Sequence, residues 1–269
     1  MILNAGNILL IGSILLFVSI VVGKAGFRFG VPALLLFLGV GMLFGTDGLG
    51  IEFNNPQTAQ FIGVIALSII LFSGGMDTSA AEIKPVLGQG IVLATVGVML
   101  TALLTGYFIY YITNLGNSFI TLNFTESLLL ASVMSSTDSA SVFSILRSKR
   151  QGLKENLRPM LELESGSNDP MAYMLTILLI GIIQSGESSL SNTILQFIMQ
   201  MSIGAVSGYL LGRLAVYCIN KLNINQSLYP VLLLAFVFFI FSFTDLVKGN
   251  GYLAVYLAGL VVGNHKVVH

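Results

Sequence analysis

Long apolar runs recur along this chain, and short stretches rich in Gly, Pro, Asn and charged residues separate them. One helical crossing of a bilayer core of ~30 Å needs ~20 mainly apolar residues. Hydrophobic residues make up 55% of the chain and charged residues 9%, with a mean hydropathy of +0.90. This composition is far more apolar than that of soluble domains. We therefore expect an all-α polytopic membrane protein whose solvent and partner is membrane lipid.

The apolar runs predict about nine transmembrane helices with little material left for a soluble domain. We place them at residues 4–23, 31–46, 58–75, 86–112, 124–146, 159–184, 192–219, 228–244 and 250–264.

Several classes of protein are disfavoured by residue type. The 12 basic and 12 acidic residues cancel, and no basic run suggests a nucleic-acid surface. Cys218 is the single cysteine, so neither an internal disulfide nor a Cys/His zinc site is expected. The chain has no GxxxxGK[ST] phosphate loop, so we expect no ATP-driven enzyme and no cofactor.

Basic residues test the division into spans independently, because short cytoplasmic loops carry an excess of Lys and Arg. Most follow odd-numbered spans or lie near their ends: Lys24, Arg28, Lys84, Arg147, Lys149, Arg150, Lys154, Arg158, Arg213, Lys221 and Lys266. Lys248 is the one basic residue on the opposite side. The N-terminus is therefore expected to face outward. The start MILNAGNILLIG lacks the features of a cleaved signal, so the first run is expected to remain as a span.

Two carboxylates lie deep inside predicted spans, where ionisable groups are rare and usually functional. Asp138 precedes the cytoplasmic Arg147 by nine residues, and Asp169 follows the cytoplasmic Arg158 by eleven. These offsets correspond to about 14 and 17 Å of helical rise, so both carboxylates reach the membrane midplane. A short basic connection makes the two spans antiparallel neighbours. A shared site is therefore predicted, and a purely structural pair of acids is the less favoured reading.

The residues around both carboxylates suit a hard cation. SSTDSAS surrounds Asp138 with hydroxyl oxygens, and ESGSNDP surrounds Asp169 with Glu164, Ser165 and Asn168. Pro170 cannot donate to the carbonyl of Gly166, so we expect a kink that frees a backbone oxygen. Acids in a poorly solvated site hold protons more tightly than in water, so a cation competes with protons there. Such competition couples cation movement to opposite proton movement.

Other polar residues are expected to be structural. Glu162 is predicted to form a partly solvated ion pair with Arg158, Asp77 to cap a helix end, and His265 and His269 to be solvated. Small residues four apart permit close helix packing at Gly41/Gly45, Gly204/Gly208/Gly212 and Gly259/Gly263. We favour packing within one subunit, with a subunit interface along the 192–219 span as the alternative.

The motifs SSTDSAS and ESGSNDP resemble the monovalent cation:proton antiporter family, in its bacterial sodium or potassium/proton branch. The resemblance extends through GVPALLLFLGVGMLFG, LFSGGMDT and GYLAVYLAGLVVGN, and so covers essentially the whole chain. It implies an inverted-repeat fold in a bacterial inner membrane.

The resemblance also implies roles for individual residues. Asp138 and Asp169 would bind the alkali cation, K⁺ or Na⁺, in competition with H⁺, with Thr137, Ser165 and Glu164 contributing. Asn168, with Pro170 beside the site, would stabilise the crossing helices and favour electroneutral exchange. Family members form homodimers through scaffold helices. We assign residues 1–269 to the N-terminal portion of a transport domain, with core-type helices at about 86–184 and scaffold-type helices at about 4–75 and 192–264.

Two alternatives stay open: a sodium-coupled symporter of related fold, and a non-transporting membrane sensor or assembly module. Members of the family have more spans than this chain provides, so it is expected to be truncated. The ligand types do not decide between Na⁺ and K⁺.

Overall fold

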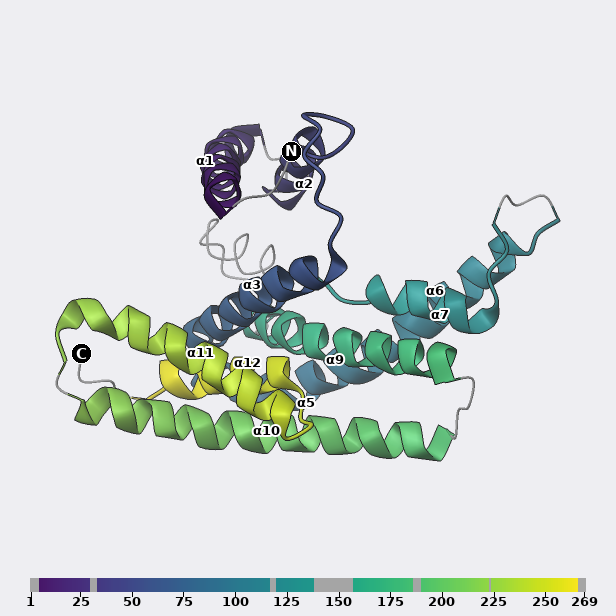
Figure 1. Ribbon diagram of the computed structural model, residues 1–269. Coiled ribbons are helices and arrows are strands. Elements are labelled where there is room, and N and C mark those ends of the chain that lie inside the picture. Colours follow the sequence, from purple (N-terminus) through teal and green to yellow (C-terminus); the bar gives the residue numbers. More distant parts are fainter. Residues whose placement is uncertain are drawn as a thin grey trace. The chain divides into compact units, whose positions relative to one another are not determined.

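The computed structural model describes residues 5–29, 33–116, 120–137, 157–185, 190–222 and 224–265. Its described regular elements are all helices (Figure 1). The chain divides into two compact units, Met1–Ile62 and Gly63–His269.

The first unit pairs two apolar helices, α1 (Ala5–Phe29) and α2 (Ala33–Phe44). They approach where α1 carries Gly23, because a Cβ there would lie 3.1 Å from Cε1 of Phe37. An irregular stretch follows, in which Gly50 adopts a φ of +73°, a conformation that glycine adopts without steric cost. Helix α3 (Pro56–Asp77) then leads into the second unit.

The second unit contains the longer helices. A continuous helical segment over Ala80–Thr113 combines α4 (Ala80–Ile83), the 3-10 turn η1 (Lys84–Val86), α5 (Leu87–Val92), the π-helical turn η2 (Leu93–Gly97) and α6 (Val98–Thr113). The remaining elements are α7 (Phe124–Val133), α9 (Leu157–Ser185), α10 (Leu190–Lys221), η4 (Gln226–Leu228), α11 (Tyr229–Leu246) and α12 (Gly251–Gly263).

Five of the described helical segments are long and apolar enough to cross a membrane by length and composition. Shorter apolar helices account for the other four predicted spans. This all-helical arrangement confirms the predicted fold class. The helix expected at 86–112 begins earlier, at Ala80, so Lys84 lies within a helical turn and not in a connection. Pro85 is tolerated here because it lies in the 3-10 turn η1, close to the start of the helical segment.

The span predicted at 124–146 is not one helix in the part that the structure describes. Asn123 begins α7 with a capping box, in which its Oδ1 accepts from the Glu126 N–H at 2.9 Å and its N–H donates to Glu126 Oε2 at 2.8 Å. The helix ends at Val133, and residues 134–137 continue as a turn and bend. Residues 138–146 lie outside the described residues.

Helix α12 is the most enclosed helix of the second unit, with buried residues along its whole length. Helix α10 packs on it through Gly204, Gly208 and Gly212; a Cβ at Gly208 would lie 2.6 Å from the Ala254 carbonyl oxygen. On another face of α12, Gly259 and Gly263 meet the backbone of α3 at Phe72 and Met76. We call these α3–α12–α10 contacts the glycine seam. The glycine stripe of α10 therefore packs within one chain, as favoured from the sequence.

Both ends of α12 are fastened by asparagine. Asn250 caps its start, accepting from the Leu253 N–H at 3.0 Å, and Asn264 at its end accepts from the Ala80 N–H at 2.7 Å and donates to the Thr78 carbonyl at 2.8 Å. Helix α3 continues through Asp77, and Ser79 holds the N-cap position of α4 without a side-chain cap hydrogen bond, so the capping role of Asp77 stays a prediction.

His265 is half-buried and fastened, contrary to the expectation that it is simply solvated. Its Nδ1 lies 2.7 Å from the Val261 carbonyl oxygen, and Nη1 of Arg213 lies 2.9 Å from its Nε2. Because a guanidinium only donates hydrogen bonds, Nε2 accepts and Nδ1 carries the proton. His269 lies outside the described residues.

Candidate functional site

The polar site forms where the non-helical tail of α7 meets the middle of α9. We call this region, residues 135–137 of the tail and 164–169 of α9, the polar crossing. Because α7 ends at Val133, the side chains of Ser136 and Thr137 leave the helical spacing and reach α9. Asp138, the next residue, lies outside the described residues, as do Ser139 and Ser141.

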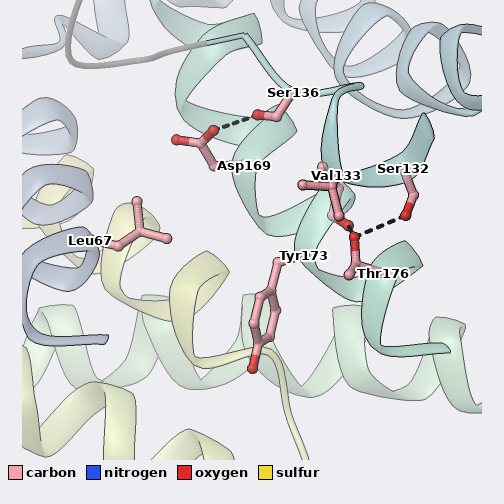
Figure 2. A pocket seen from close by; sticks show the side chains of 8 residues that line it. Leu67, Ser132, Val133, Ser136, Asp169, Tyr173 and Thr176 are labelled. Atoms are coloured by element: carbon pink, nitrogen blue, oxygen red, sulfur yellow. Dashed lines mark hydrogen bonds between the residues drawn. The ribbon is translucent and has the colours of Figure 1, made fainter. Parts of the chain in front are cut away.

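Asp169 accepts a hydrogen bond from the α7 tail. Ser136 Oγ lies 2.5 Å from Asp169 Oδ1 (Figure 2). The same oxygen lies 3.0 Å from Asn168 Oδ1. The Asp169 side chain is only half-buried, so its carboxylate reaches an open space beside the helix.

Asn168 is the most connected side chain of the polar crossing and is fully buried, at 0% exposure. Its Nδ2 donates to Thr137 Oγ1 at 2.6 Å and to Glu164 Oε1 at 3.0 Å, while its Oδ1 faces Ser136 Oγ. An amide has two N–H donors, and both are engaged here. An aspartate at this position would turn an acceptor toward Glu164. The amide therefore joins the two helices in a way that a carboxylate cannot.

Glu164 and Ser165 complete the polar crossing. Thr137 Oγ1 lies 3.1 Å from Ser165 Oγ and 3.5 Å from Glu164 Oε2. Ser165 is buried and Glu164 is half-buried. The structure thus brings together Thr137, Glu164, Ser165, Asn168 and Asp169 of the predicted set.

Pro170 lies within α9, which continues from Leu157 to Ser185 without a break. The carbonyl that a neighbouring helix binds here is that of Pro170 itself: Asn250 Nδ2 donates to it at 3.1 Å. Asn250 is 3% exposed, and its own N–H donates to the Gln200 carbonyl of α10 at 2.9 Å. One residue therefore connects α9, α10 and α12. An Asn before a glycine-led apolar run is a sequence signal for the helix cap, but no sequence signal indicates the bond to Pro170.

A cavity of about 260 Å³ opens beside Asp169, between α7, α9 and α3 (Figure 2). Its polar lining is Ser132, Ser136, Asp169, Tyr173 and Thr176, and its apolar lining is Leu67, Val133 and Ala172. The two hydroxyl oxygens of Ser132 and Thr176 lie 3.0 Å apart across the helices. Sequence reasoning missed both residues.

Glu162 lies outside this set. Its Oε1 pairs with Nε of Arg158 at 3.1 Å, which confirms the predicted ion pair. The Glu162 side chain is 7% exposed, so it is buried more deeply than expected, while Arg158 stays 41% exposed. Among the residues that the structure describes, no group of three or more His, Cys, Asp or Glu side chains is arranged to hold a metal ion. Asp138 lies outside those residues.

A family model described as "Sodium/hydrogen exchanger, transmembrane" matches residues 12–269. The chain is 42% identical over 262 residues to the K(+)/H(+) antiporter NhaP of Alkalimonas amylolytica, covering 97% of this chain and 44% of that protein. It is 37% identical over 264 residues to the K(+)/H(+) antiporter NhaP2 of Shewanella oneidensis, with the same coverage of 97% and 44%. The chain therefore spans less than half the length of these curated relatives.

The fold is also similar to that of a solved structure. The sodium proton antiporter MjNhaP1 from Methanocaldococcus jannaschii matches with a TM-score of 0.78 and 22% sequence identity. The match covers 94% of this chain and 60% of that one. At this identity, the similarity concerns the fold.

Proposed function

The chain belongs to the transmembrane sodium/hydrogen exchanger family, and from this premise we propose that the protein is a secondary antiporter that exchanges K⁺ or Na⁺ for H⁺. It is an integral membrane protein with several apolar helices. The observation that carries the proposal is the Asp169 carboxylate, held by Ser136 at the edge of a cavity inside an apolar bundle. Energy comes from the ion gradients, and no covalent step or cofactor is involved.

The mechanism is competition for carboxylate oxygens. A proton on Asp169 removes the negative charge that a cation needs, and a bound cation displaces the proton. We propose that Asp138 acts with Asp169, which is supported by its position next to Thr137 in the α7 tail. Ser136, Thr137, Ser165 and Glu164 supply further oxygens. If the site opens alternately to each side, each turnover moves a cation one way and a proton the other.

We also propose that the exchange is electroneutral. Asn168 supports this because its amide is uncharged and does not bind or release a proton during turnover. The position next to Asp169 therefore adds no second carboxylate that could carry an extra proton. Its engaged N–H groups leave it a structural role between the helices. Recordings on solid-supported membranes should then show no sustained charge movement while a pH dye reports exchange. A sustained current that reverses with the cation gradient would contradict a one-for-one exchange.

The arrangement in the membrane is a further part of the proposal. We place the protein in a bacterial inner membrane with its N-terminus outside, and assign residues 86–184 to core-type helices and 4–75 and 192–264 to scaffold-type helices. A homodimer would use a face of α10 other than its glycine stripe, which is occupied by α12. That other face is apolar and exposed, at Val206, Tyr209, Leu210, Leu214 and Tyr217, and suits either lipid or a second copy.

Proteoliposomes test the function directly. The protein, expressed from its complete reading frame, is reconstituted with a pH dye inside, and Na⁺ or K⁺ is added outside. We expect saturable proton movement with at least one of the two cations, and its loss in Asp169→Asn. Glu126→Gln, at the capped start of α7, serves as a matched carboxylate control. Equal proton movement in wild type and Asp169→Asn would contradict the mechanism through Asp169, and no proton movement in wild type would favour a sensor or assembly module. Cation uptake that needs an organic solute would indicate a symporter.

A further inference from the structure

The cavity beside Asp169 continues along α9 away from the polar crossing. Asp169, Tyr173 and Thr176 follow one another at spacings of four and three residues, so they share one face of α9. Ser136 and Ser132, four residues apart in the chain, line the same cavity from the α7 side. Thr176 lies about 10 Å beyond Asp169 along the helix axis, at ~1.5 Å per residue. Hydroxyl groups therefore line the cavity from its far end to the carboxylate.

The volume of this cavity suits a partly hydrated ion. About 260 Å³ holds several water molecules, since one water needs roughly 10–15 Å³ of such space. A monovalent cation with part of its hydration shell fits in this space.

The hydroxyl pair at the far end has more hydrogen-bond contacts than protons. Ser132 Oγ lies 2.8 Å from the Leu129 carbonyl oxygen, and Thr176 Oγ1 lies 2.8 Å from the Ala172 carbonyl oxygen. The two hydroxyl oxygens are also 3.0 Å apart. Each hydroxyl has a single proton, so two protons serve three contacts. When both protons point to the helix carbonyls, the lone pairs of the two oxygens face each other and the cavity.

Without a cation, one hydroxyl can donate to the other. With a cation beside the pair, both protons can stay on the helix carbonyls while both oxygens offer lone pairs to the cation. Hydroxyl and carbonyl oxygens are the ligands that alkali and other hard cations prefer. We propose that Ser132 and Thr176 form a second cation subsite, where the incoming K⁺ or Na⁺ loses part of its water before it reaches Asp169. This inference rests on the proposed antiport function and names two further residues that determine cation affinity. Because Ser132 precedes Ser136 in α7 and Thr176 follows Asp169 in α9, we infer that the cation reaches the subsite from the side of the membrane on which α7 begins and α9 ends.

Isosteric variants test the subsite. Thr176→Val and Ser132→Ala remove one oxygen each, while Thr176→Ser keeps the hydroxyl. Thr113→Val is the matched control, because Thr113 Oγ1 donates to the Ile109 carbonyl of its own helix at 2.9 Å and does not line the cavity. The readouts are the cation KM from each side of oriented vesicles, the maximal rate, and the order of preference among Li⁺, Na⁺ and K⁺.

We expect Thr176→Val and Ser132→Ala to raise the cation KM about five- to tenfold from the cavity side, the fold-change for losing one polar ligand. The order of cation preference should change, with the maximal rate retained. Thr176→Ser and Thr113→Val should behave as wild type. A merely structural tie between α7 and α9 would lower the rate or the yield of folded protein without changing cation preference, and this result would overturn the subsite. An unchanged KM in both variants would also overturn it. Absence of cation-coupled proton movement in the wild-type protein would instead overturn the antiport function itself.

Discussion

The glycine seam and the polar crossing both hold helices together inside an apolar bundle, but they do so with opposite kinds of residue. In the seam, Gly208 of α10 and Gly259 of α12 have no side chain, so the backbones of neighbouring helices come into contact there. In the crossing, hydroxyl, amide and carboxyl groups fill the contact between α7 and α9, and a cavity stays open beside them. Close backbone contact leaves no space for water or an ion, whereas polar groups around a cavity admit both. We therefore expect the glycine seam to be a static helix contact and the polar crossing to be the region that binds and moves the ion.

The largest effect on folding should come from adding one methyl group to the seam. A Cβ at Gly208 would lie 2.6 Å from the Ala254 carbonyl oxygen, a backbone atom that cannot rotate away. Gly208→Ala should therefore lower the free energy of unfolding by ~1–3 kcal/mol, the usual cost of overpacking. Thermal unfolding in detergent measures it.

Gly181→Ala is the matched control for this prediction. A Cβ at Gly181, within α9, meets nothing within 4 Å. Alanine is the better helix former by up to ~1 kcal/mol, so this variant should be neutral or slightly stabilised. Equal destabilisation of both variants would show that the seam is no more tightly packed than the rest of the bundle.

The next effect concerns Asn250, which joins the seam to the crossing. Asn250→Ala leaves the Pro170 carbonyl without its 3.1 Å partner, next to Asp169. The maximal exchange rate should fall about three- to tenfold, as for the loss of one hydrogen bond at ~0.7–1.4 kcal/mol. Exchange assays in proteoliposomes measure it.

Asn264→Ala provides the comparison at the other end of α12. Asn264 bonds Ala80 and Thr78 and has no described bond to α9. The Asn264→Ala variant should have a lower free energy of unfolding, but the exchange rate per folded molecule should not fall to the same extent. If both variants lose the rate equally, Asn250 acts only through stability, and its position beside the site has no separate role.

The smallest effect should come from Glu162, which is charged and close in sequence to Glu164 but lies outside the crossing. Glu162→Gln keeps an acceptor for Arg158, whose side chain is 41% exposed. Glu162 is buried, but the exposed guanidinium keeps the pair partly solvated and the amide still accepts from it, so the free energy of unfolding should change by about 1 kcal/mol. The cation KM should stay the same. A several-fold change in KM would extend the functional site toward the start of α9.

The long helices were predicted well from the sequence, because a continuous apolar run of about 20 residues has few alternatives to a transmembrane helix. The helix expected at 159–184 is α9, Leu157–Ser185, and the ion pair of Arg158 with Glu162 followed from its four-residue spacing. The early end of α7 at Val133 was missed because apolar residues resume at 142–146, beyond SSTDSAS, and so extend the apolar run past the polar residues.

Contacts between residues far apart in the chain were the part that sequence reasoning could not supply. The pairing of Ser132 with Thr176 and the bond from Asn250 to Pro170 join residues separated by 44 and 80 positions. Helical periodicity gives the face on which a residue lies, but not the residue that it meets on another helix. Asp169 and Asn168 stood out because charged and amide groups are costly inside an apolar span, whereas single Ser and Thr residues there are common.

The central claim is that a cation and a proton compete for Asp169, and proton release from purified protein in weakly buffered detergent solution tests it most directly. Adding K⁺ or Na⁺ to wild-type protein should release protons with saturation, and the half-saturating cation concentration should rise as the pH falls. Asp169→Asn should release none, although it folds to the same thermal stability within ~1–2 kcal/mol, the usual size of a single polar substitution. Cation binding by wild type without proton release, or equal release by Asp169→Asn, would contradict this account.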